Sequence, residues 1–274
     1  MPTNEPTRRR RATLVAAAVA VVCAAGIATV ALTTGTPGAV PSRTPVAAAS
    51  TAVATPTPTP TPTPAATTPS GPQEPVDAPA SSTVAAAKGA TVPVSATPGG
   101  ARTEQLPNPQ ASGAPLVFRV LDQRDGWVQV QLAQRPNGSS GWVPTSAVTL
   151  STTPYAIVVD EATNTLDLYR NGTVLHSYAV ATGTGGTPTP TGRFALTELL
   201  APTNGGYGPY AYGTTAFSDV LNSFGGGPGQ IGLHGTDDAS SIGTDASHGC
   251  VRMRNADITT LAKTLPLGTP FQVR

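Results

Sequence analysis

The chain has 274 residues and a formal net charge of +1, with only 11% charged residues and with 29 glycines and 29 prolines. So much glycine and proline and so little charge predict that long stretches lie outside any packed core. Four consecutive arginines at residues 8–11 form the only basic cluster of the sequence. Because nucleic acid binding requires a broad basic surface, we expect no nucleic acid partner.

An uncharged run rich in alanine and valine, residues 13–32, follows these arginines. At about 1.5 Å per residue, a helix of this length crosses the roughly 30 Å of a bilayer's hydrocarbon. Basic residues before the run favour a cytoplasmic position for residues 1–12, so we predict a single-pass membrane anchor with the rest of the chain outside the cytoplasm. Cleavage of a long signal peptide, which would secrete the protein to the cell wall, is the alternative. Cys23 is expected to be a small membrane-buried residue.

Residues 33–83 consist mainly of threonine, proline, alanine and serine, and they include an alternating Thr-Pro tract at 55–64. Proline removes backbone donors and favours the polyproline II conformation. We therefore predict an extended linker between the anchor and the folded part. Its length suits a tether that crosses a wall layer, and a generic spacer is the alternative.

Residues 84–150 contain short alternating apolar runs separated by Arg124-Asp125-Gly126 and by Pro136-Asn137-Gly138, which are typical turn sequences. The predicted strands are 91–94, 116–121, 127–132 and 141–144. They indicate a small β-barrel, and the Gly-Trp-Val pieces around Trp127 and Trp142 resemble bacterial SH3-like modules. The two tryptophans either bind glycan or peptide or fill the core, and we expect the core and a spacer role for this region.

Residues 153–274 continue with the same alternation. The predicted strands are 155–160, 165–169, 174–180, 193–199 and 270–274. Asn171-Gly172 tolerates positive φ at both turn positions and therefore predicts a tight hairpin. A short helix is expected at 255–263, with Asn255 as its N-cap and Asp257 in its first turn. The predicted fold class is mainly β, a small barrel followed by a β-sandwich-like domain with one short helix.

Cys250 is the only cysteine outside the apolar run, and two histidines, His234 and His248, precede it. A thiol becomes a strong nucleophile when an imidazole removes its proton, so this group suits covalent acyl transfer. The same three side chains are competent zinc ligands. The sequence has no Cys-X-X-Cys pair and no obvious fourth ligand, so we predict no metal.

Three pieces of sequence resemble the L,D-transpeptidase (YkuD-like) family, which remodels bacterial peptidoglycan. They are His234-Gly235-Thr236, the run from Ser247 to Arg252 and the loop at 181–194, and the resemblance covers residues 154–274. It implies that Cys250 is the nucleophile, that His234 is the general base oriented by the carbonyl of Gly235, and that His248 is a second imidazole of the site. An exchange of roles between the two histidines stays open.

Neighbouring residues have expected roles of their own. Gly249 leaves room beside the nucleophile, and its amide and that of Cys250 are expected to stabilise an oxyanion. Ser247 either donates a local hydrogen bond or shapes the turn. Arg252 either binds a substrate carboxylate or forms a surface ion pair. Finally, the glycine- and tyrosine-rich run 205–213 suggests a flap over the cleft, in which Tyr210 and Tyr212 contact substrate. Gly235 is expected to contact substrate as well.

The resemblance implies that Cys250 attacks residue three of a stem tetrapeptide, releases D-alanine and transfers the acyl group to the amine of a neighbouring stem. No cofactor is implied, and carbapenem-type β-lactams are expected to acylate the same thiol. Hydrolysis, as an L,D-carboxypeptidase or endopeptidase, is one alternative. Transfer to another acceptor, such as a wall-anchored protein, is a second, and a non-catalytic wall-binding module is a third.

Overall fold

The computed structural model describes residues 75–202 and 204–274, which belong to one compact unit. The predictions for residues 1–12, for the apolar run 13–32 with Cys23 and for most of the linker 33–83 lie outside these residues. Within the described ranges, no helix is both long enough and apolar enough to cross a membrane.

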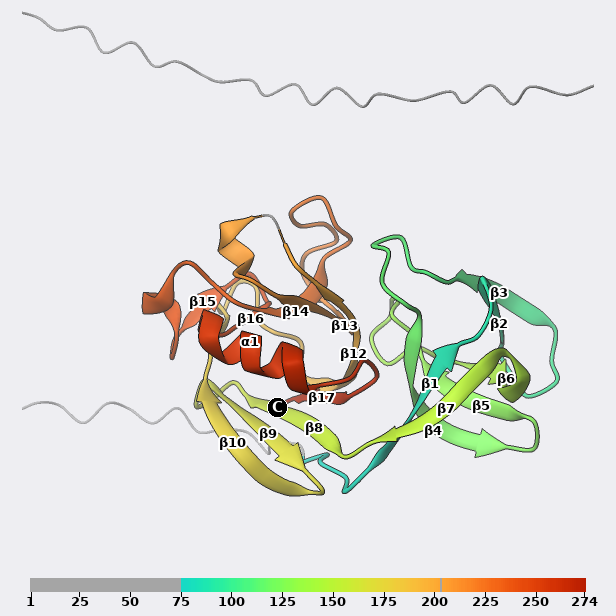
Figure 1. Ribbon diagram of the computed structural model, residues 1–274. Coiled ribbons are helices and arrows are strands. Elements are labelled where there is room, and N and C mark those ends of the chain that lie inside the picture. Colours follow the sequence, from blue (N-terminus) through green and yellow to red (C-terminus); the bar gives the residue numbers. More distant parts are fainter. Residues whose placement is uncertain (1–74, 203) are drawn as a thin grey trace, which may run out of the picture. The chain divides into compact units, whose positions relative to one another are not determined.

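The first half of the described chain forms a seven-stranded sheet, here called the N-terminal sheet, with strand order β3-β2-β6-β5-β4-β1-β7 (Figure 1). Its strands are β1 (Ser82–Ala87), β2 (Thr91–Ser95), β3 (Arg102–Pro107), β4 (Val117–Arg124), β5 (Trp127–Gln131), β6 (Ser140–Pro144) and β7 (Val148–Thr153). The predicted strands correspond to β2, β4, β5 and β6. The sequence analysis missed β1, β3 and β7. An alanine-rich strand such as β1 and a polar strand such as β3 lack the apolar alternation that identifies a strand.

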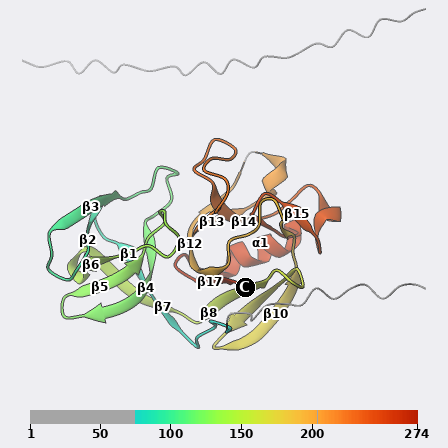
Figure 2. The same ribbon diagram turned by 180° about the vertical axis from the view of Figure 1, so that it is seen from behind.

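The second half forms an eight-stranded sheet, the C-terminal sheet, with strand order β10-β9-β8-β17-β12-β13-β14-β16. Its strands are β8 (Tyr155–Asp160), β9 (Thr165–Arg170), β10 (Thr173–Ala179), β12 (Gly192–Leu200), β13 (Ala211–Phe217), β14 (Gln230–His234), β16 (Val251–Arg252) and β17 (Pro270–Val273). Two further short strands, β11 (Thr182–Gly183) and β15 (Asp245–Ser247), pair with each other. Figure 2 shows the same elements from behind.

The mainly β fold and the short helix are as predicted. The only α-helix among the described residues is α1 (Asn255–Thr264), which buries Ile258 and Leu261 against the C-terminal sheet. The predicted hairpin is also confirmed, because Asn171 and Gly172 adopt φ values of 53° and 75° between β9 and β10. Each sheet has its own cluster of buried apolar side chains.

The described end of the predicted linker, residues 75–83, is part of the fold rather than a free tether. The Asp77 carboxylate forms an ion pair with Arg119 of β4 at 2.9 Å, and its backbone N–H donates to Oε1 of Gln272 in β17 at 2.7 Å. Strand β1 then begins at Ser82. The predicted linker therefore extended too far, because proline and alanine content alone does not reveal such side-chain partners.

The Tyr212 side chain belongs to the core, where the sequence analysis had expected a flap residue. Its side chain is fully buried, and its hydroxyl donates to the carbonyls of Leu261 and Leu265 at the end of α1, at 3.1 and 3.0 Å. Burial raises the pKa of this hydroxyl well above its usual value. The tyrosine thus joins β13 to the helix, a role that a glycine- and tyrosine-rich sequence does not disclose.

Replacing Tyr212 by phenylalanine should lower the free energy of unfolding by about 1 kcal/mol, because the helix end loses a buried donor. Denaturant titration measures the change. Tyr210→Phe is the matched control and should unfold as the wild type does. Equal stability of the Tyr212→Phe protein, combined with weaker substrate binding, would contradict the core role.

Candidate active site

The site is built on the parallel pairing of β14 with β16. Their register sets Leu233 opposite Val251, and both side chains are fully buried in the core. Because successive side chains alternate along a strand, their neighbours turn to the other face. The residues on that face are Gly232, His234, Cys250 and Arg252. Two strands that are distant in sequence therefore bring the predicted nucleophile and base together.

The Cys250 thiol is partly buried and lies against the backbone of β14. Its Sγ accepts a hydrogen bond from the N–H of Gly232 at 3.3 Å. Burial raises the pKa of the thiol above its ordinary value, whereas this N–H and the charge of Arg252 act in the opposite direction. At neutral pH the sulfur is therefore a thiol and needs a base to become a nucleophile.

His234 is oriented to act as that base. Its side chain is buried, and Nδ1 lies 2.5 Å from the carbonyl oxygen of Gly235. A carbonyl oxygen can only accept, so Nδ1 carries the proton and Nε2 is free. An ideal Cβ at Gly232 would lie 3.6 Å from His234 Cδ2 and 3.8 Å from Cys250 Sγ. Because Cδ2 is bonded to Nε2, the ring edge with the free nitrogen and the thiol both face Gly232.

Burial lowers the pKa of His234 to about 4, and the charge of Arg252 lowers it further, while the hydrogen bond to Gly235 opposes both effects. The imidazole is therefore neutral at pH 7. A raised pKa for the thiol and a lowered pKa for the imidazole together favour a neutral pair over a thiolate and an imidazolium.

The turn before the nucleophile is closed by Ser247. Its hydroxyl accepts from the N–H of Gly249 at 3.0 Å and donates to the carbonyl of Cys250 at 2.5 Å. Gly249 has a φ of 114°, and a Cβ there would lie 3.0 Å from Ile231 and 3.3 Å from the Pro188 carbonyl oxygen. The predicted oxyanion role of the Gly249 amide is therefore wrong, because the buried serine already uses this N–H.

The loop 181–194, which the sequence analysis included in the motif, holds this turn through hydrogen bonds. Its strand β11 pairs in parallel with β15. The N–H of Thr184 donates to the Ser247 carbonyl at 3.0 Å, and the hydroxyl of Thr187 reaches the same oxygen at 3.3 Å. This part of the motif fixes the nucleophile's turn and does not itself line the cavities described next.

Two cavities meet at the thiol, with volumes of about 270 and 170 Å³. Both are lined by the same four residues, Tyr207, Phe224, His234 and Cys250. The Tyr207 ring lies 4.6 Å from that of His234, between centroids. Two substrate chains could therefore approach Cys250 through different cavities, and the rings of Tyr207 and Phe224 line both cavities.

Tyr207 lines both cavities, and the sequence analysis did not single it out; Tyr212 also belongs to the lining of the larger cavity. The predicted contact at Tyr210 is wrong, because that side chain packs against the core of the C-terminal sheet and lines neither cavity. Three tyrosines within six residues gave no signal for choosing among them. Only the short 3₁₀ turn Gly205–Tyr207 places one ring beside His234.

The two cavities differ in charge. Arg252 and His248 line the smaller cavity, whereas Glu198 lines the larger. His248 is exposed, and its ring stacks on Phe224 with centroids 4.9 Å apart. His234, which is buried beside the thiol, is therefore the histidine placed to act as a base. No group of three or more His, Cys, Asp or Glu side chains in the described ranges is arranged to hold a metal ion.

Asn255 is not the N-cap of α1, which corrects the sequence analysis. The helix begins at this residue, Arg254 precedes it, and no side chain caps the end. The Asn255 Oδ1 instead accepts from the N–H of Thr236 at 3.0 Å. A Cβ at Gly235 would collide with this oxygen. Gly235 is therefore buried under Asn255 and acts on His234 through its carbonyl, and it lines neither cavity.

Comparison with known proteins agrees with this geometry. The model of the YkuD L,D-transpeptidase catalytic domain matches residues 154–273. YkuD of Bacillus licheniformis, which is named as an L,D-transpeptidase, is 34% identical over 122 residues, or 44% of this chain and 67% of the relative. The chain belongs to the L,D-transpeptidase family. YkuD of Bacillus subtilis, also named as an L,D-transpeptidase, is 35% identical over 118 residues, or 43% of this chain and 65% of the relative.

The chain spans about two thirds of the length of the curated relatives it matches. Among solved structures, the catalytic domain of an E. faecium L,D-transpeptidase is 23% identical, with 44% of this chain and 96% of that chain covered and a TM-score of 0.34. L,D-transpeptidases are peptidoglycan-modifying enzymes. The region of this chain that matches the family contains Cys250, His234, His248 and Arg252.

Alkylation should show that Cys250 is not a preformed thiolate. Because the thiol pKa is raised and the His234 pKa is lowered to about 4, the rate of iodoacetamide alkylation should rise with pH through and beyond the ordinary thiol range. Mass spectrometry of the Cys250 peptide measures the rate separately from that of Cys23. A plateau between pH 5 and 8 that disappears in His234→Gln would instead show a thiolate paired with an imidazolium.

Proposed function

We propose that this L,D-transpeptidase cross-links peptidoglycan stems through an acyl-enzyme at Cys250. The sulfur attacks the carbonyl of residue three of a donor tetrapeptide, a thioester forms, and the bond to the terminal D-alanine breaks. The amine of an acceptor stem then attacks the thioester and restores the thiol. The observation that carries this proposal is the placement of Cys250 and the free edge of His234 around Gly232.

His234 moves the protons in both half-reactions. The neutral Nε2 accepts the thiol proton as sulfur attacks, and the imidazolium then gives this proton to the departing D-alanine amine. In the second half-reaction Nε2 accepts a proton from the attacking amine and returns it to sulfur. The hydrogen bond from Nδ1 to the Gly235 carbonyl keeps the ring in the required tautomer throughout.

The oxyanion has a narrower choice of donors than the sequence suggested. The Gly249 N–H is bound by Ser247, and the Gly232 N–H points at the sulfur. The N–H of Cys250 itself forms no hydrogen bond with any described residue, so we assign it as an oxyanion donor. Ser247 holds the Cys250 carbonyl and thereby fixes the peptide that follows the nucleophile.

The charges of the two cavities support an assignment of the two substrates. Arg252 and His248 line the smaller cavity, where a guanidinium matches the carboxylate at the end of the donor stem. Glu198 lines the larger cavity, where its carboxylate would attract the cationic amine of the acceptor before proton loss. Carbapenem-type β-lactams, whose strained carbonyl would meet the same sulfur, are proposed as covalent inhibitors of Cys250.

The organisation of the whole chain is part of the proposal. Residues 84–150 would form an SH3-like domain and residues 153–274 the catalytic domain. Residues 13–32 would act as a membrane anchor, with the catalytic domain outside the cytoplasm, or as a signal that is removed from a secreted protein. A peptidoglycan substrate requires the extracytoplasmic position, and the uncharged run is what supports it.

Incubation of the full-length protein with a stem tetrapeptide should give an adduct that lacks one D-alanine, visible by intact-protein mass. Cys250→Ala should give none, and His234→Gln should slow its formation by about 10²–10⁴-fold because the general base is lost. His176→Gln, at an exposed position of β10 that lines neither cavity, is the matched control and should retain the rate. A wild-type protein that binds the stem but forms neither adduct nor product would point to a wall-binding module.

The products separate transfer from hydrolysis in the same experiment. An adduct that resolves into a cross-linked dimer when an acceptor stem is added supports the transpeptidase. An adduct that resolves only into tripeptide, with or without acceptor, would instead establish an L,D-carboxypeptidase.

A further inference from the structure

We propose that Arg135 and Asn137, in the turn between β5 and β6, are positioning residues for the loop 218–229, here called the roof loop. Phe224, Gly225, Gly227 and Pro228 of this loop line the larger cavity beside Cys250. The N-terminal sheet would then be a working part of the substrate site and not only a spacer. This inference rests on the proposed function for its catalytic consequence, but not for its structural one.

Arg135 ties the two ends of the roof loop together. Its Nη1 donates to the Ser218 carbonyl at 2.7 Å, and its Nη2 donates to the carbonyls of Leu221 and Pro228 at 2.9 and 3.3 Å. The guanidinium also lies over the Phe217 ring, 5.3 Å from its centroid. A planar group with donors on two nitrogens can reach carbonyls at the start and the end of one loop, which a lysine ammonium cannot reproduce.

Asn137 holds the residue from which the roof loop departs. Its Nδ2 donates to the Phe217 carbonyl at 2.8 Å, and its Oδ1 accepts from the Phe217 N–H at 2.8 Å. The side-chain amide thus replaces a strand partner at the end of β13. Nδ2 also lies 3.3 Å from the Asp219 carboxylate, and this carboxylate would repel an aspartate that replaced Asn137.

The roof loop has little apolar packing of its own to fix its shape. Val220 and Phe224 remain 52% and 43% exposed. The internal hydrogen bonds are few. The Ser218 N–H donates to the Gly229 carbonyl at 2.8 Å, Phe224 and Gly227 bond to each other, and the backbone of Val220 and Leu221 donates to the Ser218 hydroxyl. Segments with few buried apolar contacts open at low free-energy cost, so the contacts from Arg135 and Asn137 have a large effect on the loop's order.

A second loop of the N-terminal sheet reaches the opposite wall of the same cavity. The Ser112 hydroxyl donates to the carboxylate of Glu198, and Gln110 Nε2 donates to the Thr197 carbonyl at 3.0 Å. Because Glu198 lines the larger cavity, the N-terminal sheet contacts that cavity from two sides.

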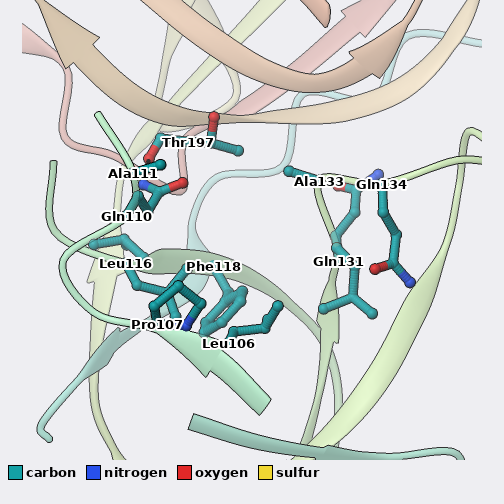
Figure 3. Close-up of a pocket in the computed structure, with 12 residues that line it drawn as sticks. Leu106, Pro107, Gln110, Ala111, Leu116, Phe118, Gln131, Ala133, Gln134 and Thr197 are labelled. Carbon is teal, nitrogen blue, oxygen red and sulfur yellow. Dashed lines mark hydrogen bonds between the residues drawn. The ribbon is translucent and has the colours of Figure 1, made fainter. Parts of the chain in front are cut away.

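A cavity of about 200 Å³ lies between the N-terminal sheet and Thr197 of β12 (Figure 3). Its other lining residues belong to the N-terminal sheet and its loops, and most of them are apolar. Two buried polar atoms of residues in its wall, Gln131 Oε1 and Thr197 Oγ1, have no hydrogen-bond partner. In addition to the hydrogen bonds of Arg135 and Asn137, those of Gln110, Ser112 and Gln131 link the N-terminal sheet to residues of β12.

Hydrogen exchange on full-length Arg135→Ala tests the structural half of the inference without any substrate. Exchange of residues 218–229 should accelerate, because the loop ends lose their shared donor. Arg124→Ala is the matched control, since Arg124 lies on the same sheet, stacks over Trp142 and makes no contact with the roof loop. Unchanged exchange in the roof loop would overturn the inference whether or not the protein is a transpeptidase.

Kinetics on the same variants test the catalytic half. Arg135→Ala should lower kcat/KM for the stem substrate by about tenfold or more, since a misplaced wall degrades substrate alignment. Cys250 should remain reactive to alkylation, because the hydrogen bonds that hold the thiol and His234 come from Gly232 and Gly235 and not from the roof loop. Asn137→Asp provides a second variant if Arg135→Ala folds poorly. Faster hydrogen exchange of the roof loop combined with wild-type turnover of the stem substrate would overturn the positioning role. If the wild-type protein does not turn over stems, the rate of acylation by a carbapenem is measured in place of kcat/KM.

Discussion

The site depends on one constraint, the parallel register between β14 and β16. This register pairs Leu233 with Val251 in the core, and the burial of both side chains fixes which face the neighbouring residues occupy. A shift of one residue would turn Cys250 inward and separate it from His234. The closure of the Ser247 turn and the support from loop 181–194 then add precision to a placement that the strands have already made.

The electrostatics of the pair follow from this placement. Both Cys250 and His234 lie against the backbone of β14, where burial disfavours charge on either group. The charge of Arg252 favours thiolate and disfavours imidazolium, so it cannot by itself create an ion pair. A neutral resting pair limits unwanted reactions of the thiol, and it places the cost of charge separation in the step where substrate is present.

Local patterns in the sequence predicted the strands with alternating apolar residues, the Asn171-Gly172 turn and the pair of Cys250 with His234. These features depend on neighbours in sequence or on a specific motif. What the sequence could not show were side chains whose partners lie far along the chain. Asn255 looked like a helix cap but binds Thr236, and Tyr212 looked like part of a flap but anchors a helix.

The same reason explains why the contacts of the N-terminal sheet were invisible in the sequence. Arg135 lies in an ordinary turn, and its partners begin 83 residues later. The sequence indicated a spacer because composition does not record where a guanidinium points. The proposed link between the N-terminal sheet and the site therefore runs through backbone carbonyls, which carry no signature in the side-chain pattern.

Nitrogen NMR of His234 in the full-length protein tests the central claim most directly, because it reports both the tautomer and the charge of the ring. The account predicts a neutral ring at pH 7, with the proton on Nδ1 and Nε2 free, and with protonation only as the pH falls toward about 4. An imidazolium at pH 7, or a neutral ring with its proton on Nε2, would contradict the proposed base and the neutral Cys250–His234 pair.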